Sequence, residues 1–392
     1  MNARVLMLLS NPFNPDERVM REATALGKAG CEVTILAWDR EGRFPQDEVF
    51  PHFRVERLRY RSPYGTAAMG KLVVFNLKLF WRIFRHPSEI IHCHDFDTLL
   101  PGYFAGRLSG RKVVYDAHEY YGGMVRGISQ SGFITRLSRL VDGVEAFLVR
   151  HVDAVITVVP WLLERYESLG ARRTITIYNA KDLKQPSQDA PEVKALRTKL
   201  GLKAGDFVYL YAGLYDQRRA LDLQIAAFKK PKFRSLNLVT VGFERDLTIK
   251  ELKAKAGASP NIKILPGVPV TQFWPYLAVA SAVDVIHNPS DPNFVISMPN
   301  KFFEAVAAGR PMITTEGLFI ADLVKKHRAG LVIPFNDQAA FEKALDELST
   351  DHELYHKLAN GAQQLGEREY NWATNEERLV KFYRDLQKKV AK

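Results

Sequence analysis

Residues 297–315 have the sequence Ser297-Met298-Pro299-Asn300-Lys301-Phe302-Phe303-Glu304-Ala305-Val306-Ala307-Ala308-Gly309-Arg310-Pro311-Met312-Ile313-Thr314-Thr315, which predicts a loop, a short helix, a tight turn and a buried strand. Pro299 or Asn300 can open the helix, because a first-turn residue needs no N–H partner within it. Gly309 can end the helix with a left-handed cap, and Pro311 prevents its continuation. Spacings of three and four residues define two faces: Phe303, Val306 and Ala307 toward the core, and Asn300, Glu304 and Ala308 on another side.

The start of this helix suits an anion. Its first N–H groups lack partners within the helix, and the helix dipole is positive at this end. Glu304, one turn deeper, could accept hydrogen bonds from both hydroxyls of a ribose, and this pairing fits a nucleotide sugar. The alternative is that Glu304 is a solvated residue on an amphipathic helix.

Residues 299–311 closely resemble the signature P-N-K-x-F-E-x-x-A-x-G-x-P of family 4 glycosyltransferases, which have the GT-B fold. The resemblance implies a donor site that includes Ser297, Pro299, Asn300, Lys301 and Glu304. The resemblance also implies that Glu304 binds the ribose of the donor. The family usually has an earlier glutamate that is separated from this one by seven residues, and Ile296 occupies that position here.

Composition and length describe a globular protein. The 392 residues suffice for two domains, and the formal charge of +11 suits nucleic acid, an anionic membrane or phosphorylated substrates. Cys31 and Cys93 have no metal-type spacing, so we expect reduced thiols and a cytoplasmic location. No apolar run approaches the roughly 20 residues that span a bilayer, and a soluble or peripheral protein is expected.

Residues 4–37 predict a parallel sheet with right-handed crossovers, because a buried strand, a helix and a second buried strand follow one another. Ligands of such sheets bind at the carboxyl ends of strands, which places the loop of residues 11–18 at a site. The resemblance assigns Asn14 and Arg18 to the acceptor side. For Arg18, a salt bridge with Asp16 or Glu22 is an alternative.

Two segments are basic and amphipathic. Residues 71–85 predict a helix with four basic residues, and residues 124–149 predict a second amphipathic helix with arginines along and beyond it. Such helices can lie on an anionic membrane surface. The alternative is a core helix with a solvated basic face.

Two predicted strands end in polar clusters. Residues 89–95 lead into Asp95-Phe96-Asp97, which formally matches the D-x-D metal motif of GT-A glycosyltransferases; short patterns match by chance, and we predict no metal. A strand ending at Tyr115 precedes His118 and Glu119. The resemblance places His118 against the donor sugar as a catalytic residue and Glu119 on the acceptor side. Alternatively, His118 is tied to Asp116 or Glu119 in a surface turn.

A further predicted strand, residues 207–213, ends at Gly213, where the backbone can approach a ligand closely. Arg218 and Arg219 follow, and arginine forks fit a diphosphate. The resemblance aligns Arg219 with a phosphate-binding lysine and assigns it a catalytic role. It also places Gly267 and Val268 over the nucleotide base. A solvated basic helix start is the alternative for the arginines.

The sequence therefore predicts two Rossmann-like, doubly wound α/β domains, and the resemblance implies that they have the GT-B arrangement and face each other across a cleft. We expect an acceptor-side domain over residues 1–185, a nucleotide-sugar domain over residues 186–370 and a crossover helix over residues 371–392 that returns to the first domain.

The resemblance implies a retaining glycosyltransferase that moves a sugar from a nucleoside diphosphate (NDP) sugar to a saccharide or lipid-linked acceptor, in surface polysaccharide or glycolipid biosynthesis. We expect a UDP-sugar rather than a GDP-sugar, no cofactor and no nucleic-acid partner. Peripheral association with the inner face of an anionic membrane is a further expectation. Two alternatives remain: a nucleotide-sugar epimerase of the same fold, and a non-catalytic protein that binds anionic surfaces.

Overall fold

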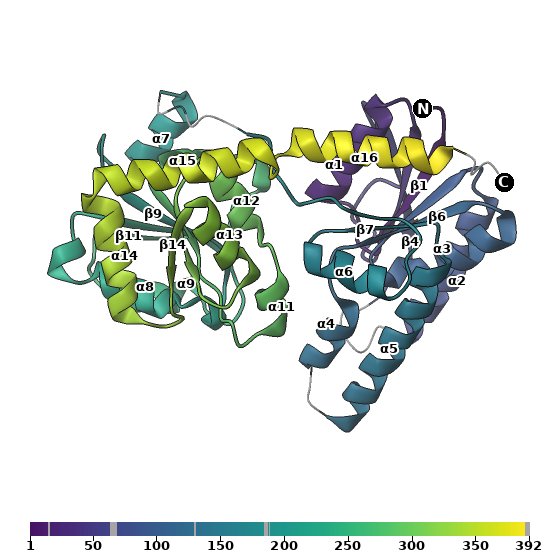
Figure 1. Cartoon of the computed structure of the whole chain (residues 1–392), viewed down its shortest axis with the longest axis horizontal. Helices are drawn as coiled ribbons and strands as arrows, with labels where there is room; N and C mark the ends of the chain where they lie inside the picture. Colours follow the sequence, from purple (N-terminus) through teal and green to yellow (C-terminus); the bar gives the residue numbers. More distant parts are fainter. Residues whose placement is uncertain (15, 63–68, 129–130, 184–186, 188, 389–392) are drawn as a thin grey trace. The chain divides into compact units, whose positions relative to one another are not determined.

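The computed structural model describes residues 1–14, 16–62, 69–128, 131–183, 187 and 189–388. It divides into two compact units: unit 1 comprises Met1–Tyr178 and Asn375–Lys392, and unit 2 comprises Asn179–Thr374. The domain boundary expected between residues 185 and 186 lies outside the described residues. Figure 1 shows that each unit consists of a twisted sheet with helices packed against it.

In its described part, unit 1 has an eight-stranded sheet with the order β3-β4-β2-β1-β5-β6-β7-β8. Neighbouring strands are parallel except that β3 is antiparallel to β4. The strands are β1 (Arg4–Leu8), β2 (Glu32–Asp39), β3 (Asp47–Phe50), β4 (Phe53–Arg59), β5 (Ile90–His94), β6 (Lys112–Ala117), β7 (Ala154–Thr157) and β8 (Thr174–Thr176). The central strands are buried runs of apolar residues, as expected for a parallel sheet with covered faces.

The helices of unit 1 are α1 (Glu17–Lys28), α2 (Met69–Arg85), α3 (Phe96–Ser109), α4 (Tyr121–Ile128), α5 (Gly132–His151) and α6 (Pro160–Ser168). One prediction was wrong: residues 124–149 do not form a single helix. Ser131 starts α5, because its side chain accepts a hydrogen bond from the N–H of Ile134. In the core, the Trp38 and Phe75 rings stack with centroids 3.9 Å apart.

Unit 2 has a six-stranded parallel sheet with the order β11-β10-β9-β12-β13-β14 in its described part. The strands are β9 (Val208–Tyr215), β10 (Asn237–Glu244), β11 (Ile262–Pro266), β12 (Ala282–Val285), β13 (Met312–Thr315) and β14 (Gly330–Ile333). The chain order reverses between β9 and β12, which is the switch point of a doubly wound sheet. A ligand site is expected at the carboxyl ends of these two strands.

The helices of unit 2 are α7 (Pro191–Leu200), α8 (Leu221–Phe228), α9 (Ile249–Ala256), α10 (Trp274–Val279), α11 (Pro292–Ile296), α12 (Asn300–Ala307), α13 (Phe319–His327), α14 (Gln338–Thr350) and α15 (His352–Arg368). Short 3₁₀ turns join some of them, including η2 (Gln217–Arg219), which carries both predicted arginines. The aromatic core centres on Tyr209, whose ring lies 5.6 Å from that of Phe341.

The last helix, α16 (Trp372–Gln387), begins in unit 2 and continues into unit 1 from Asn375 onward. Asn375 accepts a hydrogen bond from the N–H of Tyr178 at 2.9 Å. Tyr383 is fully buried, and its hydroxyl lies 2.6 Å from Nδ1 of His92 on β5. The predicted return of the C-terminal helix to the first domain is therefore confirmed. Among the described helices, none is long and apolar enough to cross a membrane.

Candidate active site

Gly213, Arg219 and Lys301 come together at the carboxyl end of β9. The φ angle of Gly213 is +134°, a conformation that glycine adopts most readily. A Cβ at this position would lie 3.0 Å from Nη1 of Arg219 and 3.6 Å from Cε of Lys301. The glycine therefore lets the backbone run close beneath two cations.

Lys301 projects from the first turn of α12 into the unit, where it is 3% exposed. Its Nζ lies 2.5 Å from Oδ2 of Asp284 on β12 and 4.0 Å from the centre of the Tyr211 ring. Burial lowers the pKa of Lys301 to about 8, although the Asp284 carboxylate opposes this change. The ion pair ties α12 to the switch point of the sheet.

Asp284 was not identified from the sequence. It is fully buried, and its Oδ1 accepts hydrogen bonds from Gln224 at 2.8 Å and from Tyr209 at 3.3 Å. Burial raises the pKa of Asp284, while Lys301 acts to lower it. Asp284 and Lys301 lie 17 residues apart in the sequence, a spacing that by itself predicts no contact. The ion pair is therefore visible only in the tertiary structure.

The two arginines of η2 differ in their partners. Arg218 forms ion pairs of 2.6 Å with Asp216 and with Asp291. Arg219 has no ion-pair partner among the described residues, and its Nε is buried without an acceptor. Both guanidinium groups lie near the ring of Phe294, at 5.0 Å for Arg218 and 5.9 Å for Arg219. Arg219 is thus the cation that remains uncompensated at this strand end.

The N-terminus of α12 has the predicted position. Pro299 is the N-cap, and no side chain caps the first N–H groups. Phe303, Val306 and Ala307 are buried, as expected, whereas Asn300 is exposed and Glu304 is partly exposed one turn later. Ala308, expected on the same face as Glu304, is buried.

Ser297 and His287 lie before α12. The Ser297 hydroxyl donates to the carbonyl of Phe294 at 3.2 Å, so it is engaged at the end of α11. His287, which sequence reasoning missed, stacks on Phe294 with centroids 4.5 Å apart. It is 1% exposed, and neither ring nitrogen has a hydrogen-bond partner in the described structure. Burial and the nearby cations hold its pKa well below the usual range, so the ring is neutral.

Gly267 and Val268 follow β11. A Cβ on Gly267 would lie 2.5 Å from the Phe243 ring, so glycine is needed for this approach. Phe243, near the end of β10, is 58% exposed and was also missed from the sequence. An exposed aromatic ring at a strand end offers a stacking surface for a planar group.

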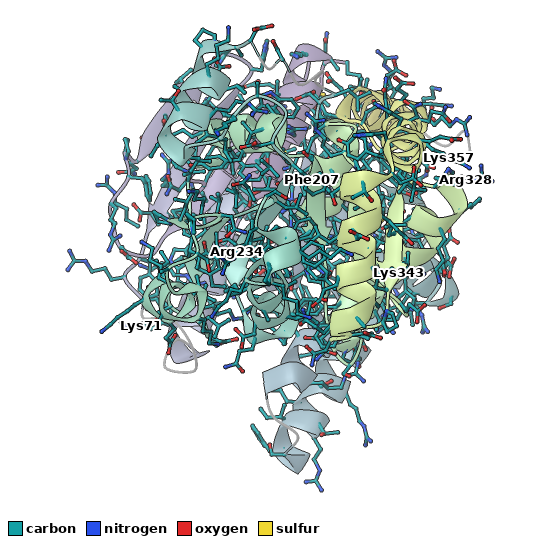
Figure 2. All side chains as sticks on the ribbon, turned by 90° about the vertical axis from the view of Figure 1, so that its left-hand side faces the viewer. Lys71, Phe207, Arg234, Arg328, Lys343 and Lys357 are labelled. Carbon is teal, nitrogen blue, oxygen red and sulfur yellow. The ribbon has the colours of Figure 1, made fainter. Side chains whose placement is uncertain are left out.

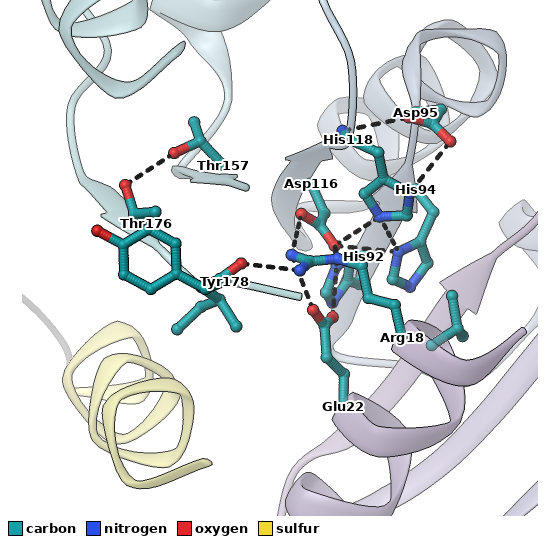
Figure 3. Close-up of polar contacts among 12 residues, drawn as sticks. Arg18, Glu22, His92, His94, Asp95, Asp116, His118, Thr157, Thr176 and Tyr178 are labelled. Atoms are coloured by element: carbon teal, nitrogen blue, oxygen red, sulfur yellow. Dashed lines mark hydrogen bonds and ion pairs between the residues drawn. The ribbon is translucent and has the colours of Figure 1, made fainter. Parts of the chain in front are cut away.

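His118 in unit 1 lies at the end of β6, between two carboxylates (Figure 3). Its Nε2 is 3.0 Å from Oδ2 of Asp116, and its Nδ1 is 3.3 Å from Oδ2 of Asp95. Against the opposing effect of burial, these two carboxylates raise the pKa of His118 to about 9. The alternative in which His118 is tied to Asp116 is therefore present in the structure. Glu119, the other candidate partner, is exposed.

Arg18 forms a buried network with Asp116. Its Nη2 lies 2.9 Å from both Glu22 and Asp116, and its Nη1 donates to the carbonyl of Ile177 at 2.8 Å. The alternative salt bridge with Glu22 is therefore present. Although burial opposes it, the charges of Arg18 and His118 hold the pKa of Asp116 well below its usual range. Asn14 is exposed on the loop before α1.

Glu22, His92, His94 and Asp116 form a group that could hold a metal ion, since each offers a ligand atom within 4.8 Å of the others. The guanidinium of Arg18 already contacts both acidic side chains of this group, Glu22 and Asp116, at 2.9 Å. A divalent ion would have to displace that cation, which argues against a metal here. The absence of a metal requirement stays a prediction.

Asp95 has a strained backbone, with φ +63° and ψ 165°. This region is essentially restricted to glycine, and such strain clusters at functional sites. The carboxylate accepts a hydrogen bond from the N–H of His118 at 3.2 Å in addition to the contact with its ring. Asp95 therefore fixes the turn that presents His118, rather than serving only as part of a chance motif.

Two family models match the chain. The model described as Glycosyltransferase Family 4 matches residues 17–185, and the model described as Glycosyl transferases group 1 matches residues 192–365. A Bacillus subtilis (strain 168) protein, EpsD, whose name assigns it to the glycosyltransferases, is 25% identical over 309 residues, covering 75% of this chain and 76% of its own length. The lipopolysaccharide core biosynthesis glycosyltransferase LpsE of Rhizobium meliloti (strain 1021) is 25% identical over 230 residues, which are 57% of this chain and 62% of LpsE.

Solved structures share the fold across the whole chain. Sucrose-phosphate synthase from Thermosynechococcus elongatus has a TM-score of 0.75 at 19% identity, covering 98% of this chain and 99% of that one. Anabaena HepE in complex with UDP-glucose has a TM-score of 0.71 at 16% identity, covering 98% and 100%. Since the two family models together match most of the sequence and the architecture is that of GT-B enzymes, this chain belongs to the family 4 glycosyltransferases.

Proposed function

We propose that this glycosyltransferase transfers a sugar from an NDP-sugar to a saccharide or lipid-linked acceptor with retention of configuration. The observation that carries the proposal is the cluster of Gly213, Arg219 and Lys301 beside the uncapped N-terminus of α12. Two cations and free N–H groups at one strand end suit a diphosphate. In this proposal Arg219 contacts the diphosphate, and Lys301 contributes mainly through its charge.

Glu304 would hold the ribose, because its carboxylate lies one turn beyond the helix N-terminus on the side not buried in the core. Phe243 and the turn at Gly267 and Val268 would face the base. A UDP-sugar is favoured over a GDP-sugar; HepE, which shares the fold, is described in complex with UDP-glucose. No cofactor is invoked, since the positive groups of unit 2 would stabilise the departing diphosphate.

The transfer step would break the bond between the anomeric carbon and the diphosphate oxygen. The acceptor oxygen would form its bond to that carbon on the same face, and its proton would pass to the departing phosphate. His118, positively charged at neutral pH, would donate a hydrogen bond to the sugar rather than act as a base. Its Nδ1 could donate this hydrogen bond if the 3.3 Å contact between Nδ1 and Asp95 is broken.

A role in surface polysaccharide or glycolipid biosynthesis is supported by the likeness to LpsE, whose name places it in lipopolysaccharide core biosynthesis. The expected cytoplasmic location, with peripheral association at the inner face of a membrane, belongs to this proposal. Asn14 and Glu119, both exposed at strand ends of unit 1, are proposed to face the acceptor, and Arg18 would support them through Asp116.

The test uses Glu304→Ala and calorimetry with UDP, GDP and ADP. Loss of hydrogen bonds to a charged group should weaken binding of the preferred nucleotide by about 1.5–3 kcal/mol. Glu244→Ala, a carboxylate exposed at the end of β10, serves as a matched control. Unchanged affinity in folded Glu304→Ala would refute the ribose contact.

Measurement of the reaction products distinguishes glycosyl transfer from the alternative activity, epimerisation of the nucleotide sugar. A panel of NDP-sugars is incubated with the protein and an extract of lipid-linked saccharides, and free NDP is measured together with the sugar products. Transfer releases NDP and labels the acceptor. Conversion of the donor into another NDP-sugar, with no NDP released, would support the epimerase instead.

A further inference from the structure

His287 is a buried histidine whose ring nitrogens have no protein partner. It follows β12 at the switch point of unit 2 and is 1% exposed. Neither Nδ1 nor Nε2 has a hydrogen-bond partner in the described part of the chain. A neutral imidazole has one N–H donor and one acceptor, and burial of both without partners destabilises the folded protein. Because an apolar residue would fill the same space without this penalty, packing alone does not explain a histidine here.

Neighbouring elements hold His287 in place. Its backbone N–H donates to the hydroxyl of Thr315 on β13 at 3.3 Å, and its ring stacks on the Phe294 ring with centroids 4.5 Å apart. The next residue, Asn288, donates its N–H to the carbonyl of Arg218 at 3.0 Å. The loop after β12 is therefore tied to η2, and His287 lies beside the turn that carries the two arginines.

A second buried group at this place also has an unused donor. The Nε of Arg219 has no acceptor among the described residues. The Arg219 guanidinium lies 5.9 Å from the centre of the Phe294 ring, on which His287 stacks. Besides burial, the charges of three cations lower the pKa of His287: Lys301, Arg219 and Arg218. Polar groups that are buried without protein partners, beside several cations, are suited to bind an anion.

The charges at this site are one positive group short of balancing a diphosphate. Each phosphate of a nucleotide sugar carries one negative charge. Lys301 and Arg218 are already compensated by carboxylates. These carboxylates are Asp284, Asp216 and Asp291. Among the described residues of the site, Arg219 is the cation left without an ion pair, so the second phosphate needs another positive charge.

We propose that His287 takes up a proton when the donor binds and then donates a hydrogen bond to the diphosphate. His287 would act within the donor site of the proposed function, on which this inference rests. In the free protein, burial and the nearby cations keep the ring neutral. The negative charge of the diphosphate would favour the imidazolium instead. As the bond to the sugar breaks, negative charge builds up on the diphosphate, and the charged ring would stabilise it.

Calorimetry on the full chain measures the proton directly. A nucleotide sugar is the probe, because its diphosphate has no group that titrates near neutral pH; the tightest binder among UDP-glucose, UDP-N-acetylglucosamine and GDP-mannose is used. Titrations at pH about 7 in PIPES, MOPS and Tris, whose heats of ionisation differ, give the number of protons taken up. The wild type should take up on the order of one proton, and its affinity should fall by up to about tenfold for each unit of pH increase.

Variants distinguish His287 from its neighbours. His287→Gln keeps a hydrogen-bond donor but cannot take up a proton, so its affinity should stay nearly constant between pH about 6 and about 8. Burial lowers the pKa of Lys301 to about 8, so this lysine is mostly charged at pH about 7 and should add little to the proton uptake. The control is His356→Gln, which changes an exposed histidine of α15 beside Lys357, a surface residue in Figure 2. It should behave like the wild type.

Nitrogen NMR of protein with ¹⁵N-labelled histidine shows the state of the ring itself. The His287 signals, identified by their loss in His287→Gln, should change from those of a neutral imidazole to those of an imidazolium when the nucleotide sugar is added.

Three results would overturn the inference and leave the proposed function standing. The first is binding of a nucleotide sugar without proton uptake by the wild type. The second is equal proton uptake by His287→Gln and the wild type, and the third is a His287 ring that stays neutral in the complex. If no nucleotide sugar binds, the proposed function itself fails, and this inference fails with it.

Discussion

At the scale of single residues, adjacent side chains of the same type have different environments. Arg218 neutralises Asp216 and Asp291, so little of its charge is left for a ligand. Arg219 has no such pair among the described residues. The sequence offered both as diphosphate ligands, and only the fold, which brings Asp291 to Arg218 across 73 positions, separates their roles.

This difference predicts distinct effects of two alanine variants. Arg219→Ala should weaken NDP binding by about 1.5–3 kcal/mol and nucleoside binding much less, because only NDP carries the paired charge. Arg218→Ala should chiefly lower the stability of unit 2, since it leaves the fully buried Asp216 without its main partner. Calorimetry with UDP and uridine, together with thermal unfolding, measures both effects. Equal losses for the two ligands in Arg219→Ala would contradict the assignment.

At the scale of elements, much of the fold was predictable from local sequence. The helix over residues 300–307 followed from a proline start, a three-and-four apolar spacing and a glycine stop, and the structure has it as α12. The strand end near His118 was likewise expected, whereas the strand predicted to end at Gly213 continues to Tyr215 as β9. These signals are local, because a cap or a buried run is encoded within a few residues.

What was missed depends on contacts between distant elements. Asp284 on β12 looked like an ordinary polar residue in a buried strand, yet it holds Lys301 of α12. His92 on β5 meets Tyr383 of α16 across 291 positions. The start of a separate helix α5 was also missed, because the amphipathic pattern of the sequence continues from residue 124 to residue 149, whereas Ser131 caps the N-terminus of α5.

The Asp284–Lys301 pair predicts a large loss when only one partner is removed. Lys301→Met should destabilise unit 2 by about 3–5 kcal/mol, since it leaves a carboxylate buried without its cation. The double variant Lys301→Met with Asp284→Asn should recover part of this loss. Urea unfolding of both variants and the wild type gives the comparison. Equal stability of Lys301→Met and the wild type would show that the pair does not anchor α12.

At the scale of the whole molecule, the charged side chains of the two units have different roles. Unit 2 gathers positive groups at the switch point of its sheet, where an anionic donor is proposed to bind. Unit 1 buries a network of opposite charges that joins α1, β5 and β6 (Figure 3). A hydrogen bond between Tyr383 and His92 links α16 to it. The net charge of +11, which is known from the composition, does not show that the charged groups of the two units differ in their roles.

The network in unit 1 makes its stability depend on pH. Asp95 and Asp116 raise the pKa of His118 to about 9, compared with about 6.5 in the unfolded chain, although burial opposes this shift. The stabilising effect is therefore complete below pH about 6.5 and is lost as the pH rises through about 9. Burial also raises the pKa of Glu22 to about 8, which acts in the same direction. The pKa of Asp116 is lowered, so its contribution is instead lost in acid.

Unit 1 should accordingly unfold more easily at pH about 9.5 than at pH about 6.5, and His118 should account for on the order of 2 kcal/mol of the difference. Both cysteines, Cys31 and Cys93, are buried in unit 1, so pulsed thiol labelling in urea reports its unfolding separately from that of unit 2. His118→Gln should flatten the dependence on alkaline pH, and Asp95→Asn should shift it to lower pH because one of the two carboxylates is lost. His151→Gln, which changes a histidine outside the network, is the control. If His118→Gln and the wild type lose stability equally between these pH values, the imidazolium is not held by Asp95 and Asp116 as the structure indicates.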